Sequence, residues 1–355
     1  MFSVKRKDIR KMKRIKIAQI GCSETTHGSS ILQSMLRQSD IFEVAGLADV
    51  DIHTRPIASV FTEEGVPKMS VEELFAIPGL EAVAVECDEN LQTKYAIMAA
   101  ERGFPVLLEK PGSESDEDFD RLIDIIEEKK LPFQMNYMYR FNSAVRYAFE
   151  KVKDGELGEI YSVEAHMNCQ EPEDYRRWTS NFKGGMFYYL GCHLVDLIYR
   201  IQGEPEEIIP LSTPIQPGYI DANDLGFAVF KYKNGVSFAK VSGYEVGGAM
   251  RRQLVICGTK GTIEIRPLER PVKGYDIPKD VCTLYESYQD GTPGAPIRDW
   301  ALDGERMDFE PKNRYDEMTA FFAAMVRGEA ENPYTPEYER KLHKLFIRAC
   351  GLDAK

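Results

Sequence analysis

The stretch Phe104-Pro105-Val106-Leu107-Leu108-Glu109-Lys110-Pro111 reads as a short apolar strand that ends in a lysine between a glutamate and a proline. Proline fixes its own backbone and pushes the preceding residue toward extended geometry, so the turn presents Lys110 at the end of the strand. A lysine ammonium is a compact charge that becomes a base when it is desolvated, which suits it to proton transfer at a hydroxyl or carbonyl. Solvated lysines at strand ends are also common, so this tripeptide alone leaves both interpretations open.

Strand and helix patterns alternate on both sides of this stretch. Short apolar runs predict strands at 15–20, 42–48, 82–86, 106–108 and 132–137, and helical patterns lie between them at 30–37, 71–75, 92–102 and 115–129. Such alternation is typical of a doubly wound α/β fold with a parallel sheet. We therefore expect a doubly wound α/β domain over residues 12–135, preceded by a disordered extension at residues 1–11.

The pattern changes after residue 136. Helices are expected at 144–153, 186–201, 315–327 and 336–351, and strands at 159–167, 225–232, 236–243, 252–257 and 261–266. Asn234-Gly235 and the segment 258–261 are hairpin signals, which indicate mostly antiparallel pairing. We expect residues 136–355 to form an α+β domain with an open, mainly antiparallel sheet, and a length of 355 residues is consistent with two domains.

Composition excludes several classes of protein. The net charge of −12 disfavours binding of the main body to nucleic acid or anionic lipid. No apolar run is long enough for a membrane helix, and the N-terminus lacks the apolar core of a signal peptide, so we expect a cytoplasmic protein. The seven cysteines are scattered singly, and we expect neither disulfides nor a metal site.

A second motif contains a histidine among glycines and apolar residues, in Gly191-Cys192-His193-Leu194-Val195-Asp196. In a continuous helix, Tyr189, His193 and Asp196 have the spacing i, i+4 and i+7, so they are predicted to share one face. An apolar stripe adjoins that face, and a histidine in such a place is often a hydrogen-bonded core residue. Catalysis and packing both remain open for His193 from this motif alone.

The order of these motifs resembles the Gfo/Idh/MocA family, named after glucose-fructose oxidoreductase and inositol dehydrogenase. The resemblance rests on Glu109-Lys110-Pro111, on 136–142 (NYMYRFN), on 155–160 (GELGEI) and on 191–196 (GCHLVD), and it spans nearly the whole chain. It implies an N-terminal Rossmann domain that binds NAD or NADP, and a second domain that presents a sugar, polyol or cyclitol. It also implies that Lys110 and His193 contact the reacting hydroxyl, and that the protein forms a homodimer or homotetramer through the C-terminal sheet, for which 225–243 is the candidate surface.

The expected cofactor site departs from the family pattern. The phosphate loop calls for Gly-x-Gly-x-x-Gly, but here only Gly21 matches, and Ser23 and Thr26 stand where the other glycines belong. Hydroxyl groups and the N-terminus of the next helix offer compensating donors. His27 is expected either to face the cofactor or to cap that helix. Asp49 follows the second strand, where a carboxylate would bind ribose hydroxyls and favour NAD over NADP. Asn90, Glu109 and Lys110 complete the expected cofactor contacts.

The expected catalytic site also differs from the family pattern. Family dehydrogenases often have an aspartate four residues before the histidine, whereas this chain has Tyr189, which could hold a substrate oxygen, act as an acid or simply pack. A tryptophan with amides and cations suits stacking on a sugar ring. The residues expected to bind substrate are Tyr137, Arg140, Asn168, Trp178, Tyr189 and His193, with Arg176, Arg177 and Lys183 nearby.

These observations predict an NAD-dependent oxidoreductase that acts on a hydroxyl of a sugar, cyclitol or related polyol, with Lys110 and His193 assisting proton transfer. Two alternatives stay open. One is redox-neutral glycoside cleavage, in which transient oxidation by NAD permits elimination and the hydride then returns. The other is a non-catalytic ligand-binding relative, suggested by the altered loop and by Tyr189.

Overall fold

Five parallel strands form the first sheet of the computed structural model, which describes residues 13–22, 27–50, 65–272, 279–288 and 304–352. The strand order is β2-β1-β3-β4-β5, and every neighbouring pair is parallel. All side chains of β3, β4 and β5 are buried, which explains why β3 and β4 are continuous apolar runs; β5 buries Gln134 between its two apolar residues. The strands are β1 (Ile15–Ile20), β2 (Phe42–Ala48), β3 (Ala82–Val85), β4 (Val106–Leu108) and β5 (Phe133–Met135).

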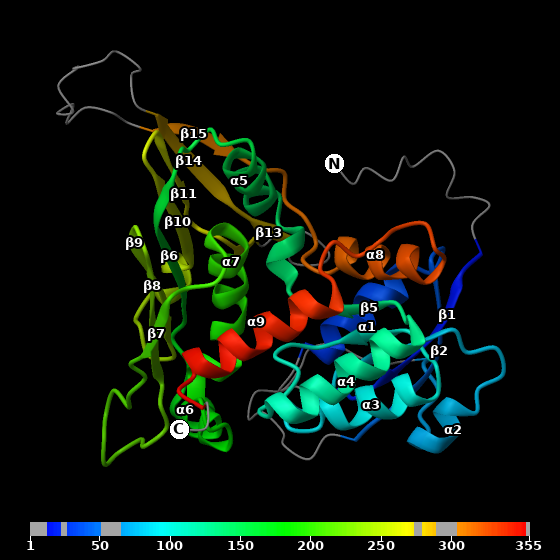
Figure 1. Cartoon of the computed structure of the whole chain (residues 1–355). Helices are drawn as coiled ribbons and strands as arrows, with labels where there is room; N and C mark the ends of the chain where they lie inside the picture. The colour runs from blue at the N-terminus through cyan, green and yellow to red at the C-terminus, as the bar shows by residue number, and fades with distance from the viewer. Residues whose placement is uncertain (1–12, 23–26, 51–64, 273–278, 289–303, 353–355) are drawn as a thin grey trace, which may run out of the picture. The chain divides into compact units, whose positions relative to one another are not determined.

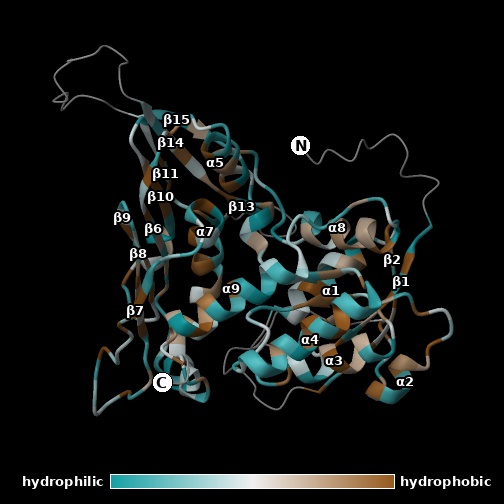
Figure 2. Ribbon diagram, viewed as in Figure 1, coloured by the Kyte–Doolittle hydropathy of each residue, from teal (hydrophilic) through white to brown (hydrophobic). Residues whose placement is uncertain are grey.

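Helices connect these strands, and local sequence sets where they begin and end. Ser115 caps α4 by accepting a hydrogen bond from the Asp118 backbone, and the helix stops at Lys130, whose φ is 53°. Figure 2 shows that α4 is largely hydrophilic outside the apolar positions that it buries, Phe119, Leu122, Ile123 and Ile126. The connecting helices are α1 (Gly28–Arg37), α2 (Val71–Phe75), α3 (Gln92–Glu101) and α4 (Asp116–Lys129). The expected doubly wound sheet is confirmed.

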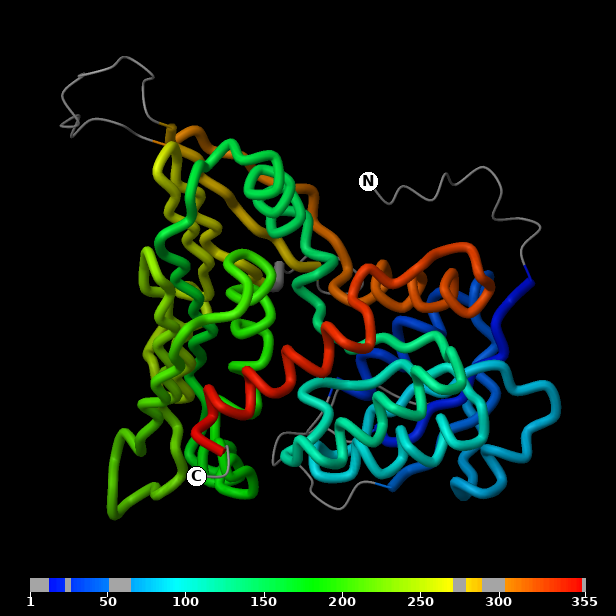
Figure 3. The backbone as a smooth tube through the Cα atoms, in the orientation of Figure 1, coloured from blue at the N-terminus to red at the C-terminus, as the bar shows by residue number. Residues whose placement is uncertain are grey.

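The chain divides into two compact units, and the first also includes part of the C-terminus. It comprises residues 1–137 and 315–343, whereas the sequence placed the last two helices in the second domain. The reason is polar contact with the first sheet's layer: Arg37 lies 2.7 Å from Asp316, and the Gln134 amide donates to the Met318 carbonyl at 3.1 Å. In Figure 3 the orange helix α8 (Asp316–Val326) accordingly runs beside the blue N-terminal segments. Helix α9 (Pro336–Ala349) begins in the first unit and ends in the second.

The second unit is built on an eight-stranded sheet of order β15-β14-β11-β10-β6-β9-β8-β7. Only β6 and β9 pair in parallel among its described ladders, so the expectation of a mainly antiparallel sheet is confirmed. Figure 1 shows α5 and α7 on the same side of this sheet. The strands are β6 (Ile160–Asn168), β7 (Glu207–Pro210), β8 (Leu225–Tyr232), β9 (Gly235–Ser242), β10 (Gln253–Gly258), β11 (Gly261–Ile265), β14 (Thr283–Tyr288) and β15 (Glu305–Asp308).

Shorter elements complete the second unit, and several were not expected from the sequence. A separate two-stranded sheet, made of β12 (Arg270–Val272) and β13 (Lys279–Val281), comes between β11 and β14 in the chain. The expected helix over 186–201 is split into a π-helical turn, Phe187–Gly191, followed by α7 (Cys192–Gln202). The remaining helical segments are η2 (Met138–Phe141), α5 (Ser143–Lys153), α6 (Glu173–Trp178), η3 (Thr179–Asn181) and η5 (Gly248–Arg251).

No helix among the described residues is both long and apolar enough to cross a membrane. Within the same residues, no group of three or more histidines, cysteines, aspartates or glutamates is placed to hold a metal ion. All seven cysteines are free thiols, and six of them are buried.

Candidate functional site

The carboxyl ends of the five parallel strands bring the candidate cofactor residues of the first unit to one edge of its sheet. Gly21 follows β1, Asp49 follows β2, Glu86 follows β3, Glu109 and Lys110 follow β4, and Asn136 follows β5. In open α/β sheets, ligands bind at this edge, where the chain switches from one side of the first strand to the other. The strand order β2-β1-β3 places that switch between β1 and β3.

Lys110 lies in a buried cluster of charged groups at the end of β4. Its side chain is 1% exposed, and its Nζ is 3.6 Å from Oε1 of Glu109, which is 2% exposed. The same Glu109 oxygen is 3.1 Å from Nδ1 of His27. Next to this pair, Asn136 donates a hydrogen bond of 2.6 Å to the Glu86 carboxyl. Lysine side chains are rarely buried unless they are paired with an opposite charge. Lys110 is both buried and paired with Glu109, so it is not a solvated strand-end residue.

The three buried glutamates of this cluster differ in their protonation. Burial and the nearby Glu109 charge raise the pKa of Glu86 well above its usual value. Burial likewise raises the pKa of Glu89 to about 8, and neither of its carboxyl oxygens has a hydrogen-bond partner within the part of the chain that is described. Burial alone would raise the pKa of Glu109 too, but the hydrogen bond with His27 and the charge of Lys110 outweigh it and lower that pKa. Glu109 is therefore the charged carboxylate of the three.

The turn after β1 needs its glycine. Gly21 has a φ of +85°, and a Cβ at this position would lie 2.2 Å from the Cα of Cys87. Its N–H donates to the Ala48 carbonyl at 2.8 Å, which ties the turn to β2. Ser23 and Thr26, the other expected phosphate-loop contacts, lie outside the described residues, as does Thr25. A tight turn with positive φ, as at Gly21, is what a dinucleotide-binding loop requires of its first glycine.

Three further expected cofactor residues are placed by the structure. His27 stands at the N-cap position of α1 but makes no capping hydrogen bond with its side chain; the ring contacts Glu109 instead. Asp49 is exposed directly after β2, where ribose hydroxyls would reach it. Asn90 is exposed in the turn after β3. With the N-terminus of α1 nearby in sequence, these residues fit a dinucleotide.

His193 lies in the second unit, in the first turn of α7. It is 1% exposed, and its ring meets that of Tyr139 edge-on, with centroids 5.5 Å apart. Asp196, one turn later, binds Arg140 through Nε and Nη2, the shortest contact being 2.8 Å. His193 and Asp196 therefore share the face of α7 that packs on η2, as their spacing predicted.

Tyr189 has different neighbours, because the π-helical turn Phe187–Gly191 interrupts the α-helical spacing before His193. Its ring meets Trp178 edge-on at 5.3 Å and stacks on Phe182 at 6.3 Å. The prediction that Tyr189 shares a face with His193 and Asp196 assumed a continuous α-helix, and that assumption is wrong. The indole N–H of Trp178 is buried and has no partner among the residues that the structure describes.

Most of the other residues expected to bind substrate are buried in the second unit. Arg140 is 4% exposed and committed to Asp196, which gives it a structural partner in place of a sugar. Asn168 is fully buried, and its amide donates to the Arg251 carbonyl at 3.4 Å. Tyr137, which ends the N-terminal segment of the first unit, is 2% exposed.

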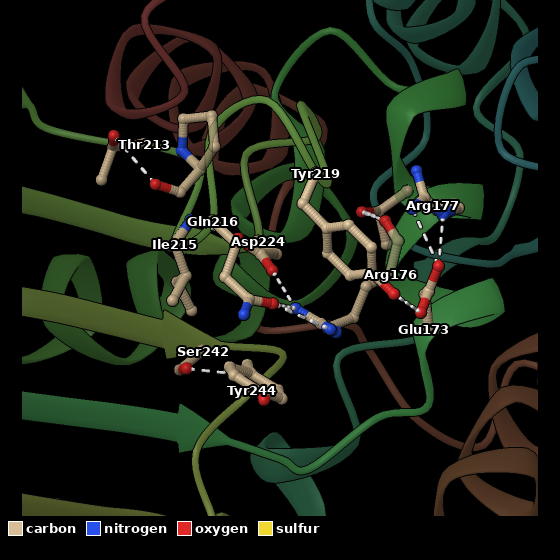
Figure 4. Close-up of polar contacts among 12 residues, drawn as sticks. Glu173, Arg176, Arg177, Thr213, Ile215, Gln216, Tyr219, Asp224, Ser242 and Tyr244 are labelled. Carbon is tan, nitrogen blue, oxygen red and sulfur yellow. Dashed lines mark hydrogen bonds and ion pairs between the residues drawn. The ribbon is translucent and has the colours of Figure 1, made fainter.

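Figure 4 shows that the arginines near Trp178 also have protein partners. Arg176 donates to Asp224 at 2.8 Å, and its guanidinium lies 3.9 Å from the centre of the Tyr244 ring. Arg177 pairs with Glu173 at the surface, at 2.8 Å. These contacts support α6 and the loop after β7, so the arginines are not offered to a ligand in the way that their sequence position suggested.

The sequence carried a signal for the two glutamates that were missed. Glu86 directly follows the fully apolar strand β3, and Glu89 comes three residues later. Charged residues at the carboxyl end of a buried parallel strand lie at the ligand-binding edge, so both belonged among the candidates.

Comparison with known proteins agrees with this arrangement. Residues 15–137 match the model of an oxidoreductase family with an NAD-binding Rossmann fold, GFO/IDH/MocA, and residues 145–264 match the GFO/IDH/MocA C-terminal domain. A D-xylose 1-dehydrogenase (NADP(+)) of Haloferax volcanii is 26% identical over 311 residues, 86% of each chain. A 2,7-anhydro-N-acetylneuraminate hydratase of Escherichia coli is 27% identical over 206 residues, 55% of this chain and 54% of the relative.

Solved structures share the fold over almost the entire chain. The WlbA dehydrogenase of Bordetella pertussis, determined with NADH and UDP-GlcNAcA, superposes with a TM-score of 0.70 at 17% identity and covers 96% of this chain and 97% of its own. The two family models together account for more than half of the chain, and they fall on the two units that the structure separates. The chain therefore belongs to the GFO/IDH/MocA family of oxidoreductases, and its first unit is the family's NAD-binding Rossmann fold.

Proposed function

We propose that this oxidoreductase acts on a hydroxyl group of a sugar, cyclitol or related polyol and uses NAD in preference to NADP. The observation that carries the proposal is the buried Lys110 at the carboxyl end of β4, set among Glu86, Glu89 and Glu109 at the ligand-binding edge of an NAD-binding fold. The xylose dehydrogenase relative, which matches over most of both chains, supports a sugar as the substrate class.

In this mechanism the amine of Lys110 removes the proton from the hydroxyl. NAD held at this edge by Gly21 and Asp49 would supply the hydride acceptor for the carbon that carries this hydroxyl. The Glu109 carboxylate compensates the positive charge that Lys110 acquires, since its Oε1 is 3.6 Å from Nζ. His193, from the second unit, is proposed to donate a hydrogen bond to the same substrate oxygen, and Tyr189 to support the sugar through the aromatic cluster with Trp178.

Asp49 supports the preference for NAD. An exposed carboxylate after the second strand accepts hydrogen bonds from both ribose hydroxyls, whereas it repels the 2′-phosphate of NADP. The xylose dehydrogenase relative is named for NADP, so cofactor choice varies within the family and depends on local residues such as this one.

A second candidate is a redox-neutral reaction. The relative from Escherichia coli is named a hydratase, and a hydratase adds or removes water without net oxidation. In that case the same Lys110 would deprotonate a hydroxyl transiently, a neighbouring bond would be eliminated or hydrated, and no NADH would accumulate.

The test is a turnover screen of the protein with NAD and a panel of free sugars, nucleotide sugars and anhydro sugars. NADH formation is followed by absorbance and the products by mass spectrometry. We expect Lys110→Met to lower kcat by on the order of a hundredfold or more. Lys16→Met is the control, because Lys16 lies near the amino end of β1, where it pairs with Glu43 at 3.0 Å. Product without NADH accumulation would favour the redox-neutral candidate, and equal loss in both variants would contradict the role of Lys110.

A further inference from the structure

Glu109 joins the buried lysine to a histidine that reaches solvent. One carboxyl oxygen, Oε1, lies 3.6 Å from Nζ of Lys110 and 3.1 Å from Nδ1 of His27. Exposure of the side chains rises along this series, from 1% for Lys110 and 2% for Glu109 to 23% for His27. All three residues belong to the first unit, so their arrangement depends on a single compact body.

We propose that Lys110, Glu109 and His27 form a proton relay between the reacting hydroxyl and solvent, which rests on the proposed function of Lys110. A buried base that takes a proton in each turnover must return it to water, and Lys110 has almost no exposed surface of its own. Oε1 of Glu109 lies at ion-pair distance from Nζ of Lys110, 3.6 Å, so a small shift of the lysine side chain brings the two atoms into hydrogen-bond distance. His27 is the next group in line and is partly exposed.

The proton balance is complete along this path. In the oxidation direction the O–H bond of the substrate breaks and its proton goes to the neutral amine of Lys110, while the hydride leaves with the dinucleotide. The ammonium passes a proton to Oε1 of Glu109, Oε1 passes one to the unprotonated Nδ1 of His27, and the imidazolium releases one from Nε2 to water. Proton exchange of the imidazole with water then restores the tautomer that carries its hydrogen on Nε2, so that Nδ1 can accept again. In the reduction direction the same groups carry a proton inward, and a distance of 3.1 Å between Nδ1 and Oε1 suits transfer either way.

The surrounding groups leave Glu109 as the carrier. Glu86, which accepts from Asn136, has a raised pKa and holds its own proton, and Glu89 is likewise raised, to about 8. Asp88 is buried in the same loop, and the ring of Tyr315 flanks His27 with centroids 5.9 Å apart. Glu109 alone among the three glutamates has a lowered pKa, so it stays ionised and can accept a proton from Lys110.

His27 is a positioning and transfer residue in this scheme, and its role must be separated from dinucleotide binding, since it follows the altered phosphate loop. The experiment compares His27→Ala with the parent enzyme, using the best sugar from the turnover screen, with and without added imidazole. The relay predicts a kcat lowered by about tenfold or more at saturating NAD and restored in part by imidazole, and calorimetry with NADH separates this loss from any loss of dinucleotide binding.

His343→Ala is the matched control. His343 belongs to the same unit and also sits against a carboxylate, with Nδ1 2.8 Å from Asp116, but it contacts neither Glu109 nor Lys110 in any described interaction. Any loss of activity in this variant should not respond to imidazole. A kcat of His27→Ala equal to that of the parent, or a loss that imidazole leaves unchanged, would overturn the relay.

A readout without turnover keeps the relay separate from the proposed function. In the NADH-bound protein, the ring nitrogens of His27 are observed by two-dimensional ¹H–¹⁵N NMR. We expect their signals to change in Glu109→Gln and also in Lys110→Met, because Oε1 of Glu109 contacts both Nδ1 of His27 and Nζ of Lys110. If the His27 signals are the same in Lys110→Met and in the parent protein, the link from Lys110 through Glu109 to His27 is refuted, even if the protein oxidises sugars. If no sugar is turned over but both variants shift the signals, the proposed function fails and the connected triad stands.

Discussion

Glu89 makes the stability of the first unit depend on pH. Its carboxyl is buried, and its pKa rises from 4.5 to about 8 on folding, so the native state keeps a proton that the unfolded chain has lost. The stability that this group contributes is present below pH 4.5 and disappears as the pH rises toward 8. At about 1.4 kcal/mol per pH unit, the change across this window is on the order of 5 kcal/mol.

We therefore expect Glu89→Gln to become more stable relative to the parent protein as the pH rises. The difference in unfolding free energy should grow by about 2 to 4 kcal/mol between pH 5 and pH 8, measured by urea denaturation at each pH. A difference that is the same at both pH values would mean that Glu89 is already ionised in the folded protein.

Asp196 and Arg140 form a buried ion pair, and we expect its loss to lower the free energy of unfolding. Both side chains are almost fully buried, and Asp196→Asn would leave the guanidinium without its charged partner. We expect a loss of about 3 kcal/mol in unfolding free energy, measured by denaturant titration. Asp221→Asn is the control, because within the described residues Asp221 accepts one exposed backbone hydrogen bond, from Gly218. If Asp196→Asn is as stable as the parent protein, the ion pair is not structurally important, and Arg140 is again a candidate for binding a ligand.

Residue patterns predicted the first unit's site better than the second's. The location of Lys110 and Glu109 follows from a buried strand that ends in charged residues, which is visible in sequence. The sequence does not show which residues contact Arg140, Arg176 and Tyr189, because each contact joins two separate segments of the chain. Contacts such as Arg176 with Asp224 arise only when the sheet and the loops around it have folded.

At the scale of elements, the turn between β1 and the first helix should tolerate no side chain at Gly21. A Cβ there combines the strain of a φ of +85° with a clash against the Cys87 backbone. Gly103 offers a matched control, since its φ is +86° but a Cβ would meet nothing within 4 Å. We expect Gly103→Ala to lose about 1 kcal/mol of stability through strain alone.

Gly21→Ala should lose more than Gly103→Ala, by at least about 1 to 2 kcal/mol, and should bind NADH more weakly. Thermal or urea denaturation gives the first comparison and calorimetry the second. If the two variants lose the same stability and Gly21→Ala keeps full NADH affinity, the close approach of this turn to Cys87 is not important.

Element types were predictable because periodicity survives in both units, whereas their interruptions were not. The strand at 225–232 and the helix at 71–75 were predicted with the observed bounds. The π-helical turn before α7 adds one residue to a helical turn, and no residue type in the sequence predicts where such an insertion occurs. It is this turn that directs Tyr189 to α6 and His193 to η2.

At the scale of the whole molecule, one face of the eight-stranded sheet is a candidate for self-association. Ser237, Ala239 and Val241 of β9 are fully buried under α7, so the alternate residues point to the other face. On that face the rings of Phe227 and Phe238 stack 5.4 Å apart and remain only partly buried in a single chain. An apolar sheet face of this kind is usually covered by a partner.

We expect the protein to be a dimer or tetramer in light scattering and Phe238→Lys to dissociate it without loss of NADH affinity. Val246→Lys is the control, because Val246 is 79% exposed in the loop after β9. A monomeric parent protein, or a Phe238→Lys variant of unchanged mass, would exclude this face as the interface.

The sequence predicted two domains, but it did not predict that most of the C-terminal helical segment, residues 315–343, belongs to the first unit. Apolar periodicity identified the last two helices, but it could not assign them, because a helix face is equally suited to either core. Their attachment to the first unit depends on particular polar pairs, such as Arg37 with Asp316 and Arg340 with Asp124 at 2.7 Å. Those pairs join residues almost three hundred and more than two hundred positions apart.

Dinucleotide binding is the property on which every catalytic proposal depends, because the loop after Gly21 lacks two of the three usual glycines. The most direct test is calorimetric titration of the purified protein with NADH and with NADPH, with mass spectrometry of any nicotinamide released on denaturation. We predict micromolar or tighter binding of NADH, weaker binding of NADPH, and loss of that preference in Asp49→Ala. If neither nucleotide binds and none is released, the chain does not use the NAD-dependent chemistry proposed for Lys110.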